Sequence, residues 1–127
     1  LLFQDQRVLP EFELKTYKSV QSIANTKTRF ATWFDALEFM KEQVGQIDFD
    51  VAILGCGAYG FPLAAHVKRM GRKAIHLGGA TQILFGIKGK RWENIPDVSI
   101  LMNEHWQRPM PSEMPDGGDK VEGGAYW

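Results

Sequence analysis

Residues 50–60 read Asp-Val-Ala-Ile-Leu-Gly-Cys-Gly-Ala-Tyr-Gly, an apolar run followed by a glycine-rich turn. A short continuous apolar run is typical of a strand buried on both faces, as in a parallel sheet covered by helices. Glycines at the end of such a strand allow a sharp turn into a helix. The stretch therefore predicts the first strand and the turn of a βαβ unit.

The residues that follow complete this unit. We expect a helix over 58–70, where Pro62 is tolerated because an amide in the first turn has no intrahelical partner. Gly71 ends the helix, and residues 73–77 form a second short strand. The predicted fold class is therefore α/β, a Rossmann-like three-layer fold with a partial, mostly parallel sheet.

Other regular elements are expected on both sides of the unit. Residues 32–44 predict the clearest helix, since their apolar residues recur every three or four positions and a threonine stands where it can cap the N-terminus. Residues 11–20 alternate only fairly well for a strand. After the βαβ unit we expect short helices over 81–85 and 98–106.

Composition is that of an ordinary globular protein. The chain has 127 residues, of which 44% are hydrophobic and 24% charged, and we expect a single domain over 1–127. Fifteen basic and fifteen acidic residues give no net charge. This argues against a protein whose main function is to bind nucleic acid or an anionic membrane, because both require an excess of basic residues. One cysteine excludes an internal disulfide framework. No apolar run of about eighteen residues occurs, so we expect no membrane span and a soluble, cytoplasmic domain.

The number of strands is low for a doubly wound sheet. Two firm strands and one doubtful strand leave a sheet edge exposed, so the missing strands belong either to a partner subunit, as in a homo-oligomer paired through that edge, or to an absent N-terminal half, which we favour. The chain also begins with Leu1, so we expect it to be the C-terminal part of a longer protein that supplies the missing strands. Residues 107–127 contain three prolines and four glycines and are expected to form an extended tail.

The turn after the first strand carries the motif G-x-G-x-x-G in the context that a diphosphate site needs. Its glycines let the backbone approach a diphosphate, whose charge meets the amides at a helix N-terminus. A tight turn with glycines for packing alone is the alternative, and Cys56 is interpreted as a small packing residue. The candidate binding residues lie in the turns after the two strands: Gly55, Gly57, Tyr59, Gly60, Gly78 and Gly79.

An acidic side chain at the end of the second strand would hold the ribose of NAD. At that place the chain has His76, and no carboxylate occurs between Gly55 and Glu93, which argues against an NAD-type site. His76 itself lies where ligands gather in open α/β sheets, so it is a candidate catalytic acid or base. A structural histidine is the alternative.

Further candidates follow the βαβ unit. Lys88, Lys90 and Arg91 form a basic loop that can clamp a diphosphate, and a solvated charge cluster is the alternative. Glu104 is a candidate catalytic carboxylate beside the stacking surface of Trp106, and the alternative is that both cap or pack a helix end. The three histidines lack metal-ligand spacing, so no metal ligand is assigned.

Several of these segments together resemble one known family. Residues 49–60, 71–79 and 85–92, together with Asn103–Trp106 and the final Gly-Gly-Ala-Tyr-Trp, resemble an uncharacterised bacterial family associated with surface polysaccharide synthesis. That family is distantly similar to glycosyltransferases of the GT-D fold. The resemblance covers most of residues 10–127.

This resemblance implies transfer of a sugar from a nucleotide donor, so the expected partner is a nucleotide-sugar-like small molecule. It also implies a divalent cation, manganese or magnesium, held by an acidic motif in an earlier part of the chain. Two alternatives come from other classes of protein. One is an NAD(P)- or flavin-binding oxidoreductase domain, and the other is a non-catalytic assembly or interaction module.

Overall fold

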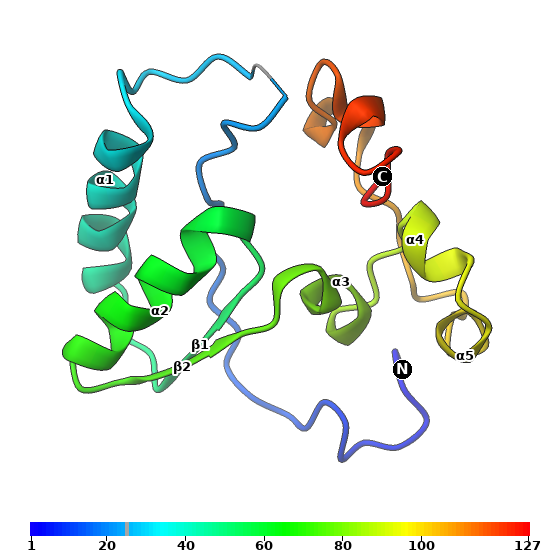
Figure 1. Cartoon of the computed structure of the whole chain (residues 1–127). Coiled ribbons are helices and arrows are strands. Elements are labelled where there is room, and N and C mark those ends of the chain that lie inside the picture. Colours follow the sequence, from blue (N-terminus) through cyan, green and yellow to red (C-terminus); the bar gives the residue numbers. More distant parts are fainter. Residues whose placement is uncertain (25) are drawn as a thin grey trace. The chain divides into compact units, whose positions relative to one another are not determined.

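The computed structural model describes residues 1–24 and 26–127 and shows a mixed α/β protein (Figure 1). Within these residues there are five α-helices and one parallel sheet of two strands. The helices and strands are α1 (Trp33–Gly45), β1 (Val51–Leu54), α2 (Gly60–Arg69), β2 (Lys73–His76), α3 (Thr81–Leu84), α4 (Lys90–Glu93) and α5 (Pro96–Ser99).

The chain divides into two compact units, which are described separately. The α/β unit consists of Leu14–Ser22 and Lys27–Thr81, and contains α1, α2 and both strands. The C-terminal unit consists of Leu1–Glu13, Ile23–Thr26 and Gln82–Trp127, and contains α4 and α5. No helix in the described part of the chain is long and apolar enough to cross a membrane.

The first helix forms as the sequence predicts. The Thr32 hydroxyl accepts a hydrogen bond from the amide of Asp35 (3.1 Å), and the Asp35 carboxylate accepts one from the amide of Thr32 (2.9 Å). A cap of this kind stabilises a helix by about 1 kcal/mol. Ala36, Leu37 and Met40 lie on the buried face of α1. The predicted helix and its N-cap are confirmed.

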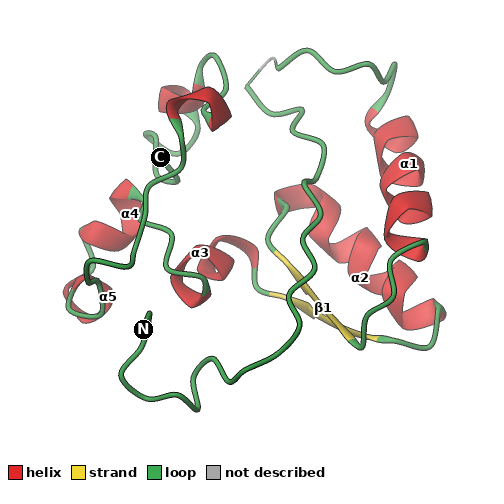
Figure 2. Cartoon of the chain, turned by 180° about the vertical axis from the view of Figure 1, so that it is seen from behind, coloured by secondary structure: helices red, strands yellow, loops and turns green. Residues whose placement is uncertain are grey.

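The two strands of the α/β unit are parallel, with Ile53 opposite Ile75 and Leu54 opposite His76 (Figure 2). Helix α2 packs against both strands and beside α1. Side chains alternate across the sheet, so Leu54 joins the core while Ile53 and Ile75 on the opposite face are 37% and 48% exposed. The mixed α/β class and the parallel pairing are confirmed, and the three-layer Rossmann-like arrangement stays a prediction.

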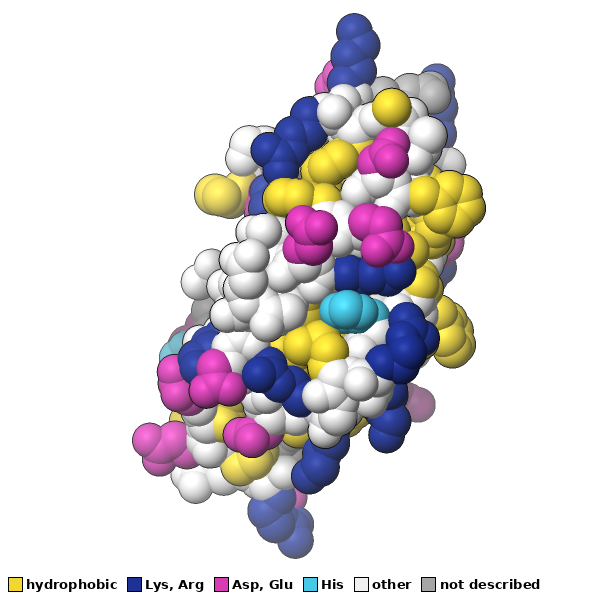
Figure 3. Space-filling view, turned by 90° about the vertical axis from the view of Figure 1, so that its left-hand side faces the viewer, with side chains coloured by type: hydrophobic (Ala, Val, Ile, Leu, Met, Phe, Trp, Pro, Cys, Tyr) yellow, Lys and Arg dark blue, Asp and Glu magenta, His cyan; other side chains and the backbone are white. Residues whose placement is uncertain are grey.

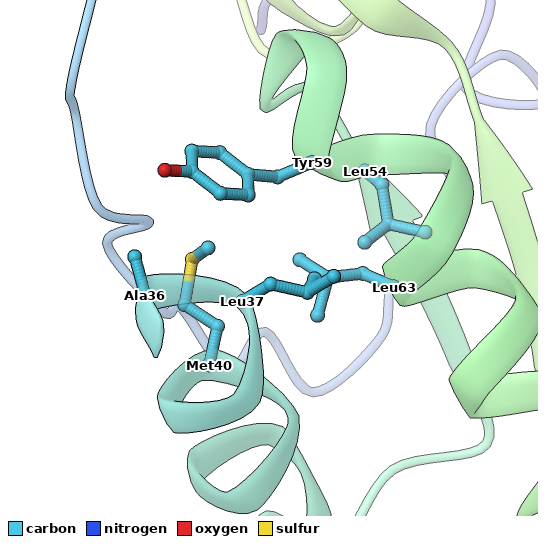
Figure 4. Packing of buried hydrophobic residues seen from close by; sticks show 6 residues of the cluster. All are labelled: Ala36, Leu37, Met40, Leu54, Tyr59 and Leu63. Atoms are coloured by element: carbon cyan, nitrogen blue, oxygen red, sulfur yellow. The ribbon is translucent and has the colours of Figure 1, made fainter. Parts of the chain in front are cut away.

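The core of the α/β unit joins α1, β1, the turn that follows β1, and α2 (Figure 4). Tyr59, in the turn, lies flat against Trp33 with ring centroids 4.8 Å apart, and its hydroxyl hydrogen-bonds the hydroxyl of Ser22 (2.9 Å). These contacts hold the turn against α1 and against residues 14–22. The buried residues of the cluster are Ala36, Leu37, Met40, Leu54, Tyr59 and Leu63.

Residues 11–20, all of them described, form no strand. Residues 14–22 nevertheless run in the same direction as β1, because Lys15 donates to the carbonyl of Asp48 (2.8 Å) before the strand and Ser22 bonds Tyr59 after it. The amide of Val20 points to the sulfur of Met40 (3.3 Å), a side chain of α1, and this side-chain contact takes the place of a backbone ladder. The expected strand at 11–20 is therefore wrong.

The C-terminal unit is built from short helical turns. The helix expected over 98–106 is wrong, because α5 begins at Pro96 and ends at Ser99. The side chain of Asn103 accepts a hydrogen bond from the amide of His105 (2.9 Å), a local turn that competes with a helix. The predicted basic loop also contains a helical turn, since α4 begins at Lys90.

Candidate functional site

The glycine-rich turn lies at the carboxyl edge of the parallel sheet. β1 ends at Leu54, a single helical turn spans Gly57–Tyr59, and α2 follows from Gly60. Because Leu54 pairs with His76, the end of β2 lies at the same edge. Ligands of open α/β sheets bind outside the carboxyl ends of strands. The strand–turn–helix context that the motif needs is thus present.

Gly55 brings the two turns at this edge close together. A Cβ atom at Gly55 would lie 2.7 Å from the side-chain oxygen of Thr81 and 3.0 Å from the carbonyl oxygen of Gly78. Real side chains do not approach so closely, so only glycine fits without a shift of the loop that follows β2. The first glycine of the motif therefore allows the turn after β1 to pack closely against the turn after β2.

Gly60 has a different role, in packing α2 against the sheet. A Cβ atom there would overlap the imidazole of His76. The ring also meets the edge of Phe61, with centroids 4.9 Å apart and an interplanar angle of 66°. The third glycine of the motif thus allows the close helix–strand contact that is typical of this position.

Gly57 leaves the turn open. Its φ of 53° lies in the left-handed region, and no described atom comes within 4 Å of the place where its Cβ would be. Gly78 in the turn after β2 has a φ of 56° and the same open space. A ligand can therefore approach the backbone of both turns without meeting a side chain at these two residues.

The electrostatics of α2 favour an anion at this end. Among the described residues, α2 has no acidic side chain in its first turn and no side chain that caps its N-terminus. His66, Lys68 and Arg69 lie in its last turn. Cations at the C-terminus complement the helix dipole, whereas the partial positive charge at the N-terminus is left for a ligand or for water.

His76 is held in a defined orientation at the edge of the sheet. Its Nδ1 lies 3.3 Å from the carbonyl oxygen of Leu54. A carbonyl only accepts, so this hydrogen bond requires a proton on Nδ1. The contact with Gly60 gives His76 a structural role at the helix–strand junction. Its action as an acid or base stays a prediction.

Thr81 is a candidate that the sequence motif does not indicate. Its hydroxyl oxygen is buried against Gly55 and has no hydrogen-bond partner among the described residues. A buried hydroxyl without a partner costs about 1–3 kcal/mol, which a ligand oxygen would offset. The only signal in the sequence is a hydroxyl residue directly after Gly-Gly-Ala at 78–80, and nothing local shows that this loop folds back onto Gly55.

Two other residues of the turn face the core. The Tyr59 side chain is 5% exposed and packs on Trp33, so its contacts are with the protein interior. Burial raises the pKa of the Cys56 thiol, which keeps the thiol protonated at neutral pH. This agrees with the interpretation of Cys56 as a packing residue.

Gly79 lies in the turn Gly78–Ala80 of the α/β unit, and the predicted residues after Thr81 belong to the C-terminal unit, where the structure brings part of them together. Lys90 donates to the carbonyl of Gly123 (3.2 Å), and the Arg91 guanidinium contacts Glu122 and the hydroxyl of Tyr126 (3.1 Å). Glu104 lies 3.7 Å from its neighbour His105, and the indole of Trp106 is buried. The amide of Lys88 donates to the carbonyl of Gln107 (2.8 Å).

Charge is evenly mixed on the face that carries α1 and α2. Figure 3 shows basic and acidic side chains interspersed there.

The described residues contain no group of three or more His, Cys, Asp or Glu side chains that could hold a metal ion.

Comparisons of the chain with protein-family models, with curated proteins and with solved structures give no match.

Proposed function

We propose that the chain binds the diphosphate of a nucleotide at the turn between β1 and α2. The observation that carries this proposal is the turn itself, where Gly57 is open, α2 lacks a side-chain cap among the described residues, and the buried Thr81 hydroxyl has no described partner. A phosphate supplies a negative charge for the helix terminus and an acceptor for the Thr81 hydroxyl, and the open space at Gly57 leaves room for it.

The nature of the nucleotide follows from the end of β2. A dinucleotide site needs a carboxylate there to hold the ribose. The α/β unit instead places the imidazole of His76 against Gly60. This favours a nucleoside diphosphate over NAD, in line with the resemblance to nucleotide-sugar-dependent glycosyltransferases.

In this proposal the protein acts on a nucleotide sugar by positioning it and by stabilising charge. The turn binds the diphosphate and stabilises its charge as the nucleoside diphosphate departs. His76 is the proposed acid–base group of the α/β unit, whereas Lys88, Lys90, Arg91 and Glu104 remain separate predictions for the C-terminal unit. The parallel strands belong, in the same proposal, to a larger Rossmann-like sheet.

The side chains of the described residues do not form a binding site for the divalent cation that such transferases use. These residues contain no cluster of three or more His, Cys, Asp or Glu side chains that could hold a metal ion. No step is therefore assigned to a metal ion held by this chain.

A thermal unfolding panel tests the proposal. The panel holds UDP, GDP, CMP and their sugars, each with manganese or magnesium, together with NAD and NADP. A ligand at a hundred times its dissociation constant stabilises the folded state by about 2.7 kcal/mol, which raises the midpoint by several degrees for a chain of this size. We expect such a rise with one nucleoside diphosphate. A rise with NAD alone, or with none of the ligands, contradicts the proposal.

A further inference from the structure

The last residues of the chain fold back onto α4 within the C-terminal unit. The amide of Arg91 donates to the carbonyl of Ala125 (3.0 Å), and the side-chain amide of Gln82 donates to the carbonyl of Tyr126 (3.0 Å). Ala125 is 6% exposed. A Cβ at Gly89 would lie 3.1 Å from the Ala125 carbonyl oxygen, so the backbone at 125–126 approaches α4 closely.

This fold-back places a carboxylate on the basic residues. Nη2 of Arg91 and the hydroxyl of Tyr126 both donate to the same oxygen, Oε2 of Glu122, the latter at 3.4 Å. The ammonium of Lys90 donates to the next carbonyl along the chain, that of Gly123 (3.2 Å). One donor from α4 and one from the tail thus meet at one oxygen of an anionic group, and that group belongs to the chain itself.

Glu122 is exposed, whereas Gly124 and Ala125 after it are buried. Its φ of 48° is left-handed, which is unfavourable for a residue other than glycine, and Gly123 and Gly124 follow with φ of 68° and 76°. The side chains of Arg91 and Glu122 are 37% and 52% exposed. Ion pairs this exposed contribute little to stability. Glu122 can therefore leave while the buried Ala125 keeps the tail in place.

We infer that Glu122 occupies a phosphate subsite formed by Arg91 and Tyr126, and that a phosphoryl group replaces it. A phosphoryl group offers more acceptor oxygens and more charge than a carboxylate, and a guanidinium binds two of those oxygens in parallel. The inference rests on the proposed function in taking a diphosphate as the ligand. The tail carboxylate then competes with a phosphoryl group for this subsite in the C-terminal unit and limits its binding there at low concentration.

The test is a titration with inorganic pyrophosphate, free of divalent metal, followed by calorimetry and by NMR of the tail amides. We expect Glu122→Gln to bind pyrophosphate about fivefold more tightly than the wild type, because the competing charge is gone. Asp116→Asn, which removes an exposed carboxylate elsewhere in the tail, is the matched control and leaves the affinity unchanged.

The donor side chains are tested in the Glu122→Gln background. Arg91→Lys keeps the charge but loses the planar fork, and Tyr126→Phe removes one hydroxyl, so each reduces pyrophosphate affinity severalfold. In the wild type, pyrophosphate shifts the amide resonances of residues 122–124. Equal binding by Glu122→Gln and Asp116→Asn, or no effect of either donor substitution, overturns the inference.

A third variant separates this subsite from the turn. Ala58→Glu places a carboxylate beside the start of α2 in the α/β unit. If Ala58→Glu changes the affinity for pyrophosphate and Glu122→Gln does not, the proposed function is retained and the subsite is rejected. If Glu122→Gln changes the affinity and Ala58→Glu does not, the subsite is retained and the proposed function is rejected.

Discussion

Gly60 and His76 form a close contact between α2 and β2, and it depends on the absence of one methyl group. Alanine has a higher helix propensity than glycine, so propensity alone predicts that Gly60→Ala stabilises α2. The overlap with the imidazole outweighs this gain, because overpacking a close contact costs about 1–3 kcal/mol. We expect Gly60→Ala to lower the free energy of unfolding in urea.

The control for this prediction is Gly45→Ala at the end of α1, where no described atom lies within 4 Å of the added Cβ. That substitution is expected to be neutral or stabilising by up to about 1 kcal/mol. Adding His76→Ala to Gly60→Ala should recover stability, because the shorter side chain makes room for the methyl. Equal effects at Gly60 and Gly45 would contradict the packing role of the third glycine.

Cys56 gives the α/β unit a specific pH dependence. Burial raises the pKa of its thiol in the folded state. Above the ordinary thiol pKa of about 8.5 the unfolded chain loses this proton while the folded chain keeps it, so stability falls as pH rises through that window. We expect urea unfolding of the wild type to show this loss.

Cys56→Ala removes the titrating group and should flatten the dependence between about pH 8.5 and the raised pKa. Tyr17, whose pKa burial also raises, acts in the same direction nearer to the ordinary tyrosine pKa of about 10. Tyr17→Phe is therefore the control for the upper part of the range. An unchanged slope in Cys56→Ala would show that the thiol does not contribute.

At the scale of elements, the sequence was informative where one local signal dominates. The apolar stripe and the cap at Thr32 predict α1, and the apolar run before Gly55 predicts β1. The prediction was wrong where side chains compete with the backbone. Helix α5 ends at Ser99, and Asn103 binds the amide of His105 in a local turn where the helix over 98–106 was expected. In the segment expected to be a strand, the amide of Val20 faces the sulfur of Met40.

The candidate site was likewise predictable only where a local sequence signal exists. The G-x-G-x-x-G spacing predicts a turn between a strand and a helix, and this context is present. The position of Thr81 in the site depends on how the loop after β2 packs against Gly55, and no periodic sequence pattern predicts that packing. The pairing of Arg91 with Glu122 joins residues 31 positions apart, so it too lies beyond local pattern.

Over the whole chain, the proposed anion-binding groups lie in two separate units. The α/β unit contains the open turn and His76, and the C-terminal unit contains Arg91 with its tail carboxylate. We propose that an anion binds at the start of α2 in the α/β unit, where no described side chain caps the helix. On this proposal, charge placed at this helix terminus changes nucleotide binding.

The most direct measurement compares the UDP affinity of Ala58→Glu with that of Ala65→Glu by calorimetry. Both alanines are exposed, and the first lies in the turn that leads into α2 while the second lies within the helix. A carboxylate at 58 stabilises the helix slightly but repels a phosphate, so we expect about tenfold weaker binding with no loss of thermal stability. Ala65→Glu should bind as the wild type does. Equal UDP affinities in the two variants would contradict the account.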